Sequence, residues 1–277
     1  MKTIKVSTTD PESGYMYREG KPEGFFYLDH RTVDVKYNII TDVHVTPGNV
    51  SDVDPYVERL DRQISTFGFN VKYVGLDAGY FSNPICKSIS ERNIQAVIGF
   101  RRSPHEKGKF TKYKFQYVKE LDIYVCPDLR ALKYKTTNRD GYKEYISNPC
   151  DCDNCEQKEK CLTGINKNKT LRRHVWEEYK EKIYNFTRTE IGKRLYKKRK
   201  ETVERSFADS KELHGLRYCR LRGLEKVSEQ CLLTSAAQNI KKIALMMAKN
   251  EVEEFIYVEF RLILPITFNY YIVFPKH

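Results

Sequence analysis

The sequence lacks any uncharged apolar run long enough to cross a membrane as a helix. Such a helix needs about 20 apolar residues. The longest uncharged apolar stretch is Leu262–Pro275, which Pro265 and Asn269 interrupt. The chain also does not open with the apolar segment of a secretory signal. We therefore expect a cytoplasmic protein without a membrane partner.

Internal repeats are also absent, and the composition is that of a folded protein. The chain has 277 residues, of which 40% are hydrophobic and 31% charged. These values exclude a disordered chain. The length suits one elaborated domain or two small ones, with enough residues to bury a core.

Acidic residues are scarce in one block near the C-terminal end. Residues 166–222 hold 18 Lys and Arg against 8 Asp and Glu, whereas the remaining residues hold 31 against 29. A charge run can be the solvated face of a helix, but a block this one-sided is more typical of a protein that binds a polyanion. Phosphate attraction gives affinity without sequence preference. We therefore expect nucleic acid as the partner.

The predicted elements alternate between strand and helix after an initial hairpin. The hairpin turns near Tyr37–Asn38, and the helix that follows is expected to be capped by Asp54 and ended by Gly68. Val71–Leu76 is a nearly continuous apolar run, typical of a strand buried on both faces. This order predicts an α/β fold with a mixed sheet flanked by helices. The expected segments are strands at 25–47, a helix at 55–67, a strand at 71–76, a helix at 83–93 and a strand at 94–100.

Helical periodicity stops after residue 102 and returns at about residue 186. The stretch between is aromatic, turn-rich and contains five of the eight cysteines. We predict a first part of the core at 1–102, a β-rich insertion at 103–185, a helical remainder of the core at 186–248 and an apolar tail of unknown role at 249–277. The last core helix is expected to bury an apolar stripe. Its members are Leu233, Ala236, Ala237, Ile240, Ala244 and Met247.

One carboxylate, Asp77, directly follows the apolar run in VKYVGLDAGYFSNP. Ligands in open α/β sheets gather at the carboxyl ends of strands, so Asp77 is a candidate metal ligand. An Asp before a turn can instead cap its own backbone. The local sequence is compatible with both roles.

A second carboxylate, Glu204, lies in KETVERSFADSK, where Lys200 and Lys211 share its helical face. Because Val203 and Phe207 flank it, we expect Glu204 near the boundary of the core. A carboxylate in that position needs a cation or a metal ion. An ion pair with Lys200, four residues earlier, is the alternative.

Asp77 after its strand and, later in the chain, Glu204 in its helix resemble the motifs of insertion-sequence DDE transposases. These proteins have a ribonuclease-H-like catalytic domain. The resemblance covers about residues 5–248. It implies that Asp77 is the second Asp and Glu204 the Glu of the catalytic set, with a β-rich insertion between them. The segments that carry it are STTDPESG, VDVKYNIITDVHVTPGNVSD, VGLDAGY, and VERSFADSKELHGLRYCRLRG followed by QNIKKI.

The resemblance also implies a chemistry and a partner. Phosphodiester hydrolysis and strand transfer would use two Mg²⁺ or Mn²⁺ ions about 4 Å apart, bound by carboxylates. The DNA would comprise the element ends and the target, held by the basic block. Its candidate contacts are Arg199, Lys200, Lys211 and Arg222. A homodimer is expected by resemblance alone.

The helix that carries Glu204 departs from the family pattern Y-x2-R-x3-E-x6-K. Lys211 matches the final Lys, but Lys200 stands where the Arg belongs. Tyr196 and Arg199 each come one position early. The sequence therefore leaves the Tyr and Arg roles open, and Lys200 could contact phosphate as a point charge.

The first Asp of the family lies on a strand ahead of the STTDP segment and has no counterpart here. Asp10 is the nearest candidate, but Pro11 and a turn follow it. We therefore expect an N-terminally truncated transposase. The alternative is a catalytically incomplete DNA-binding remnant, which would be inactive alone.

Five cysteines fall between Cys126 and Cys161. Without a secretory signal, metal binding is favoured over disulfides. Cys152 and Cys155 have the spacing of a zinc knuckle, and Cys126 and Cys161 would complete four ligands for a structural Zn²⁺, with Cys150 spare or replacing Cys152. Unligated thiols and a redox pair are the alternatives. A zinc-stapled nucleic-acid-binding protein without nuclease ancestry is a third hypothesis for the whole chain.

Overall fold

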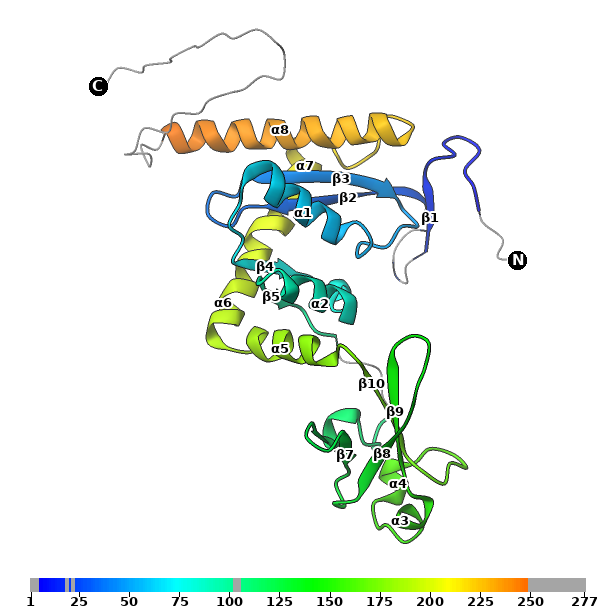
Figure 1. The fold of residues 1–277 in the computed structure, drawn as a ribbon. Coiled ribbons are helices and arrows are strands. Elements are labelled where there is room, and N and C mark those ends of the chain that lie inside the picture. Colours follow the sequence, from blue (N-terminus) through cyan, green and yellow to red (C-terminus); the bar gives the residue numbers. More distant parts are fainter. Residues whose placement is uncertain (1–4, 18–19, 21–22, 102–105, 249–277) are drawn as a thin grey trace.

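The computed structural model describes residues 5–17, 20, 23–101 and 106–248 (Figure 1). The predicted tail at 249–277 lies outside this part of the chain. Within the described ranges, no helix combines the length and the apolarity that crossing a bilayer requires.

A long antiparallel hairpin organises the first part of the chain. β2 (Gly24–Val33) pairs with β3 (Ile40–Pro47), and the short β1 (Gly14–Met16) lies on the other edge of β2. Asn38, in the turn, has a φ of 59°, a conformation that Asn tolerates better than most residues. The predicted hairpin and its turn are thus confirmed.

A parallel pair of strands follows the hairpin. α1 (Tyr56–Phe67) leads to β4 (Tyr73–Leu76), and α2 (Asn83–Glu91) crosses to β5 (Gln95–Ile98). Gly68 ends α1 in the left-handed conformation, as predicted. The expected cap at Asp54 is wrong, because Pro55 occupies the N-cap position and no side chain caps the helix.

The hairpin and the parallel pair are separate sheets in the described part of the chain. We expected one mixed sheet with Val71–Leu76 buried on both faces. Instead, β5 is the only partner of β4 among the described strands, and the Tyr73 side chain is exposed, whereas Val97 and Ile98 of β5 are buried. A strand with a neighbour on one side only remains open to solvent at its other edge. The mixed α/β character is confirmed, but the single sheet is not observed.

Consecutive helical segments connect the two sheets (Figure 1). α6 (Glu190–Arg199) contacts β4 and β5. It continues into the π-helical turn η3 (Lys200–Glu204), which contacts β2, and then into α7 (Arg205–Leu213). The helical run expected from about residue 186 is thus observed without a break over residues 190–213, and the π turn in its middle lies between the two sheets.

α5 (Glu177–Thr187) precedes this run and packs on β5 and α2. Its Ile183 joins the same apolar cluster as Ile85 and Ile98. This helix lies in the stretch assigned by sequence to the insertion, 103–185. The predicted division of the chain into domains otherwise remains a prediction.

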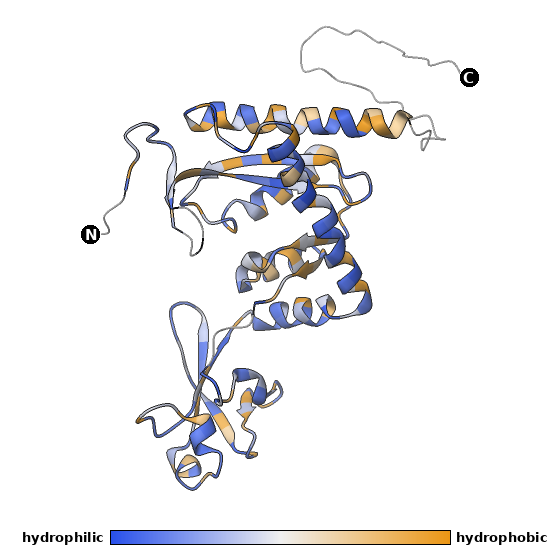
Figure 2. Ribbon diagram, turned by 180° about the vertical axis from the view of Figure 1, so that it is seen from behind, coloured by the Kyte–Doolittle hydropathy of each residue, from blue (hydrophilic) through white to orange (hydrophobic). Residues whose placement is uncertain are grey.

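α8 (Leu224–Ala248) packs on β3, but not through the predicted apolar stripe. Leu233, Ile240 and Met247 are exposed, and Figure 2 shows apolar residues along the outside of this helix. Gln238 is buried instead, and its amide donates to the Ser206 carbonyl at 3.0 Å. The stripe prediction is wrong because α8 is anchored by this polar network and, nearer its start, by Val227 and Cys231, which pack on Val45 of β3.

The predicted insertion contains a five-stranded antiparallel sheet that projects from the rest of the molecule (Figure 1). Its small core comprises Phe115, Tyr124, Leu132, Tyr145 and Leu171. The sheet order is β10-β9-β8-β7-β6. The strands are β6 (Gln116–Val118), β7 (Ile123–Val125), β8 (Ala131–Thr137), β9 (Tyr142–Ser147) and β10 (Thr170–His174), and the short helices α3 (Pro149–Asp153) and α4 (Lys158–Cys161) join β9 to β10.

Candidate active site

Asp77 follows the last residue of β4 and caps the 3-10 turn η1 (Ala78–Tyr80). Its Oδ1 accepts a hydrogen bond from the Gly79 N–H at 2.8 Å. This is the turn cap that we weighed against metal ligation, but it occupies only one oxygen. Oδ2 lies 4.0 Å from Nη2 of Arg199. The cap therefore orients the second oxygen toward the helix that carries Glu204.

Tyr196 lies beside the Asp77 loop. A Cβ on Gly99 would lie 2.5 Å from the Tyr196 hydroxyl and 3.1 Å from the backbone nitrogen of Ala78. Only glycine leaves room for this approach. Tyr196, one position early in the sequence pattern, thus lies against the turn that holds Asp77.

Glu204 is the last residue of η3 and meets the same guanidinium as Asp77. Its Oε1 accepts a hydrogen bond from Nη1 of Arg199 at 2.9 Å. The Glu204 side chain is 52% exposed, more open than we expected at a core boundary. The alternative ion pair with Lys200 is also wrong, because the partner is Arg199 and Lys200 is exposed.

The π-helical turn explains why the Arg comes one position early. A π turn holds an additional residue, since its hydrogen bonds join positions i and i+5. Arg199 precedes Glu204 by five residues and contacts it across this turn, as a residue four earlier would across an α-turn. The π turn accommodates the extra residue within the helical run. Arg199 rather than Lys200 therefore lies beside Glu204.

A buried arginine that sequence reasoning missed fixes α7 against the hairpin. Arg31 of β2 pairs with Asp29 at 2.6 Å and donates to the Ser210 hydroxyl at 2.5 Å. Burial raises the pKa of Asp29, and Arg31 opposes that shift. The feature of the sequence that could have indicated it is the charged pair of Asp29 and Arg31 in a strand without other acidic or basic residues apart from His30. This contact holds the helical run that carries Glu204 against β2.

The carboxylate pair, Asp77 and Glu204, lacks a third acidic partner among the described residues. That part of the chain holds no group of three or more His, Cys, Asp or Glu side chains placed to share an ion. Asp10 instead accepts hydrogen bonds from the Tyr27 hydroxyl and the Gly223 N–H. Two carboxylates fit one Mg²⁺ that retains waters. They do not by themselves fit a two-ion site.

The remaining cations proposed for DNA contact are open to solvent. Lys200, Lys211 and Arg222 are exposed, whereas the Arg199 side chain is only 17% exposed and is engaged by the carboxylate pair. Lys200 and Lys211 lie on the helical run that also carries Glu204.

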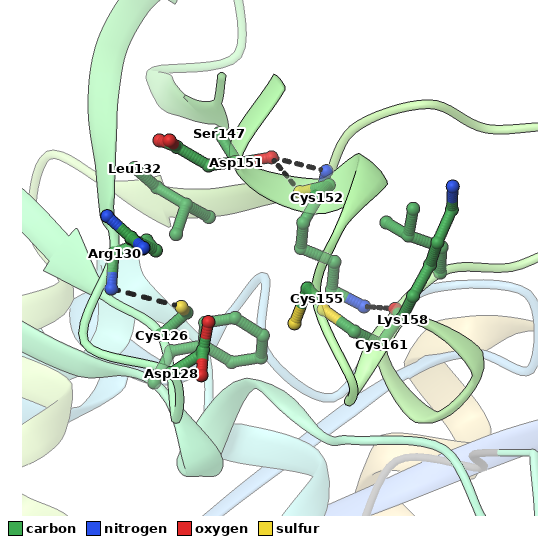
Figure 3. Close-up of a pocket in the computed structure, with 13 residues that line it drawn as sticks. Cys126, Asp128, Arg130, Leu132, Ser147, Asp151, Cys152, Cys155, Lys158 and Cys161 are labelled. Atoms are coloured by element: carbon green, nitrogen blue, oxygen red, sulfur yellow. Dashed lines mark hydrogen bonds between the residues drawn. The ribbon is translucent and has the colours of Figure 1, made fainter. Parts of the chain in front are cut away.

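The four cysteines predicted as zinc ligands line one cavity (Figure 3). Cys126 follows β7, Cys152 lies in α3, Cys155 follows α3 and Cys161 ends α4. Burial raises the pKa of the Cys161 thiol, Lys169 lowers it, and the other three thiols raise it further. Cys150, the alternative to Cys152, is exposed and is not part of the lining.

Comparison with known proteins supports the resemblance that the motifs indicate. Residues 125–244 match a family model described as a transposase DDE domain. No curated protein and no solved structure gives a match. The matched segment runs from the end of β7 into α8 and includes Glu204 and the four cysteines of the cavity. It confirms the predicted resemblance of this chain to the insertion-sequence DDE transposases.

Proposed function

We propose that this chain is the catalytic domain of a DNA transposase with a ribonuclease-H-like core. The proposed reaction is hydrolysis of a phosphodiester followed by attack of the freed 3′-hydroxyl on target DNA. The observation that supports it best is the convergence of Asp77 and Glu204, far apart in the sequence, on one guanidinium at the carboxyl end of β4. Carboxylates on rigid elements suit hard divalent ions.

The carboxylate pair would hold Mg²⁺ or Mn²⁺ through Asp77 Oδ2 and the Glu204 carboxylate. When bound, divalent ions supply Lewis-acid stabilisation of the attacking and leaving oxygens. The turn cap on Oδ1 keeps Asp77 in place while its other oxygen serves as the ligand. Before a metal ion binds, Arg199 pairs with both carboxylates. Once the ion has taken its place, the planar guanidinium can bind a phosphate of DNA.

A third carboxylate is needed to complete a two-ion site. We infer that it lies on a strand that pairs along the open edge of β4, as the resemblance to the family implies. In the described chain, β4 has no strand on that edge, and β2 has none beyond the short β1. Such a strand would also turn the two separate sheets into the mixed sheet predicted from the sequence.

DNA would reach the carboxylate pair along the basic helical run. Lys200, Lys211 and Arg222 are exposed and can contact phosphates without reading bases. A homodimer, a cytoplasmic location and N-terminal truncation remain predictions.

One observation favours the second candidate, a DNA-binding remnant without catalysis. Arg199 already pairs with both carboxylates, and the described residues offer no third acid. Such a chain would retain DNA affinity from the basic block and lose the chemistry.

The two candidates separate in a cleavage assay on labelled DNA in millimolar Mg²⁺ or Mn²⁺. With the strand that carries the third carboxylate supplied, the first predicts strand cleavage that Asp77→Asn abolishes and that Asp54→Asn, at an exposed carboxylate outside the pair, leaves unchanged. DNA binding without cleavage supports the remnant. A chain that binds neither DNA nor divalent ions contradicts both.

A further inference from the structure

A cavity of about 30 Å³ lies beneath the short helices α3 and α4 of the projecting sheet (Figure 3). It exceeds the ~10–15 Å³ that a single water requires. Its wall combines the apolar side chains of Phe115, Leu132 and Leu162 with Cys126, Cys152, Cys155 and Cys161. All four thiols are unpaired and partly buried. Four soft ligands thus line one small, partly enclosed space.

The first sulfur has a backbone donor directed at it. The Arg130 N–H donates to Cys126 Sγ at 3.3 Å, and a tight turn joins Cys126 N to Arg130 O at 2.9 Å. Leu129, within that turn, has a φ of 57° and an exposed side chain. A left-handed leucine costs about 1–3 kcal/mol and persists only where its surroundings determine it. The turn therefore presents an N–H to the sulfur at an energetic cost.

A second sulfur has a hydroxyl donor. Ser147 is buried, and its Oγ accepts the Lys169 N–H at 2.8 Å. The same Oγ lies 3.1 Å from Cys152 Sγ, so its proton is free to point at that sulfur. Hydrogen bonds of this kind favour the thiolate, the form that binds metal, and orient it.

The charges around the cavity also suit a thiolate cluster. Zn²⁺ with four thiolates carries a net charge of about −2. Arg130, Lys158 and Lys169 line the cavity, against two acids, Asp128 and Asp151. The excess of one cation offsets about half of the charge that metal binding would leave in this partly enclosed space.

The segment that holds three of these cysteines is held to residues 109 and 110 by hydrogen bonds, but it buries very little of its own surface. α3 and α4 contain no buried residue. Within residues 148–169, Leu162 alone is buried. A segment with so small a share of a core needs a staple to remain folded.

We propose that Cys126, Cys152, Cys155 and Cys161 bind one structural Zn²⁺, which fixes residues 148–169 onto the five-stranded sheet. Soft thiolates at this spacing select zinc over Mg²⁺ or Ca²⁺. Among the described residues the sulfurs do not yet lie at ligand spacing. The thiols therefore close on the ion by side-chain rotation, to Zn–S distances of about 2.3 Å.

The test is metal content and Co²⁺ spectroscopy of the reduced full-length chain. The wild type is expected to carry one zinc per chain and, with Co²⁺, to show the visible bands of a tetrahedral thiolate site. Cys155→Ser should lower Zn²⁺ affinity by more than about 100-fold, because loss of an outer-shell partner alone costs about 10–100-fold. Cys150→Ser is the matched control, at an exposed cysteine of the same segment, and should retain the metal.

A second measurement covers variants that fail to fold. Chelation of wild-type zinc should increase hydrogen exchange in residues 148–169 and leave β4 and β5 unchanged. The proposal is overturned if reduced, folded wild type takes up neither zinc nor cobalt. It is also overturned if Cys150→Ser loses as much metal as Cys155→Ser, or if chelation leaves exchange in the segment unchanged.

Discussion

The carboxylate pair and the cysteine cavity are built in opposite ways. Asp77 and Glu204 come from distant parts of the chain, are about half exposed and meet on a cation. The four cysteines come from one stretch of 36 residues and line a partly enclosed cavity. Hard oxygen ligands open to solvent suit an ion that must meet DNA. Soft ligands shielded from water suit an ion that holds a fold together.

The largest difference between the two regions should appear in stability. Cys155→Ser is expected to cost several kcal/mol of zinc-loaded stability, because structural zinc contributes about 10–16 kcal/mol of apparent binding energy in small domains. Asp77→Asn should change stability by no more than about 1 kcal/mol, since its side chain is 44% exposed and lies 4.0 Å from Arg199. Thermal unfolding with limited proteolysis measures both, and equal losses would contradict the assignment of structural and catalytic roles.

The second-largest difference between the two regions is expected in their contributions to DNA affinity. Replacing Lys200, Lys211 and Arg222 with Ala is expected to reduce the slope of log affinity against log salt by about 0.9 per lost phosphate contact. The control replaces Lys133 and Lys135, which are exposed on β8 of the projecting sheet. Fluorescence anisotropy over a salt series gives the slopes. An equal reduction in the control would mean that DNA also runs over the cysteine-containing sheet.

The π-helical turn offers a smaller and more specific test. Deleting Lys200 should convert η3 to an α-turn, retain the Arg199–Glu204 contact and change stability by no more than about 1 kcal/mol. Deleting Arg194 instead shifts α6 by one residue, rotates Tyr196 away from Gly99 and should cost more. Urea unfolding compares the two deletions. If the two deletions lower the free energy of unfolding equally, η3 does not contain one residue more than an α-helical turn.

The smallest effect concerns the cation between the carboxylates. Arg199→Ala removes a competitor for Glu204 and Asp77 and leaves two carboxylates close together. An ion pair whose carboxylates are about half exposed is worth about 1 kcal/mol or less, so Mn²⁺ affinity should rise by up to about 5-fold. Titration calorimetry checks this. A fall in affinity would indicate that Arg199 positions the pair for metal rather than competing with it.

Local patterns predicted much of the fold. Alternating apolar residues and the Tyr37–Asn38 turn indicated the β2–β3 hairpin, and Gly68 marked the end of α1. The cysteine spacing selected four side chains that line one cavity. Each of these features depends on neighbours in the sequence or on residue chemistry.

The errors came from contacts between distant residues. Burial of β4 depends on a neighbouring strand, and the buried face of α8 depends on hydrogen bonds from Gln238 to Ser206. A π turn has no periodic signature, so spacing alone placed Lys200 where Arg199 lies. Asp77 proved to be a turn cap whose second oxygen lies near a cation, which confirms the first interpretation, and its role as a metal ligand stays a prediction.

Mn²⁺ binding by titration calorimetry tests the central claim most directly. The wild type should bind Mn²⁺, and both Asp77→Asn and Glu204→Gln should weaken that binding by more than about 10-fold. Glu201→Gln, at an exposed residue of the same turn, should bind like the wild type. If both variants of the carboxylate pair bind Mn²⁺ as tightly as the wild type, Asp77 and Glu204 are not metal ligands.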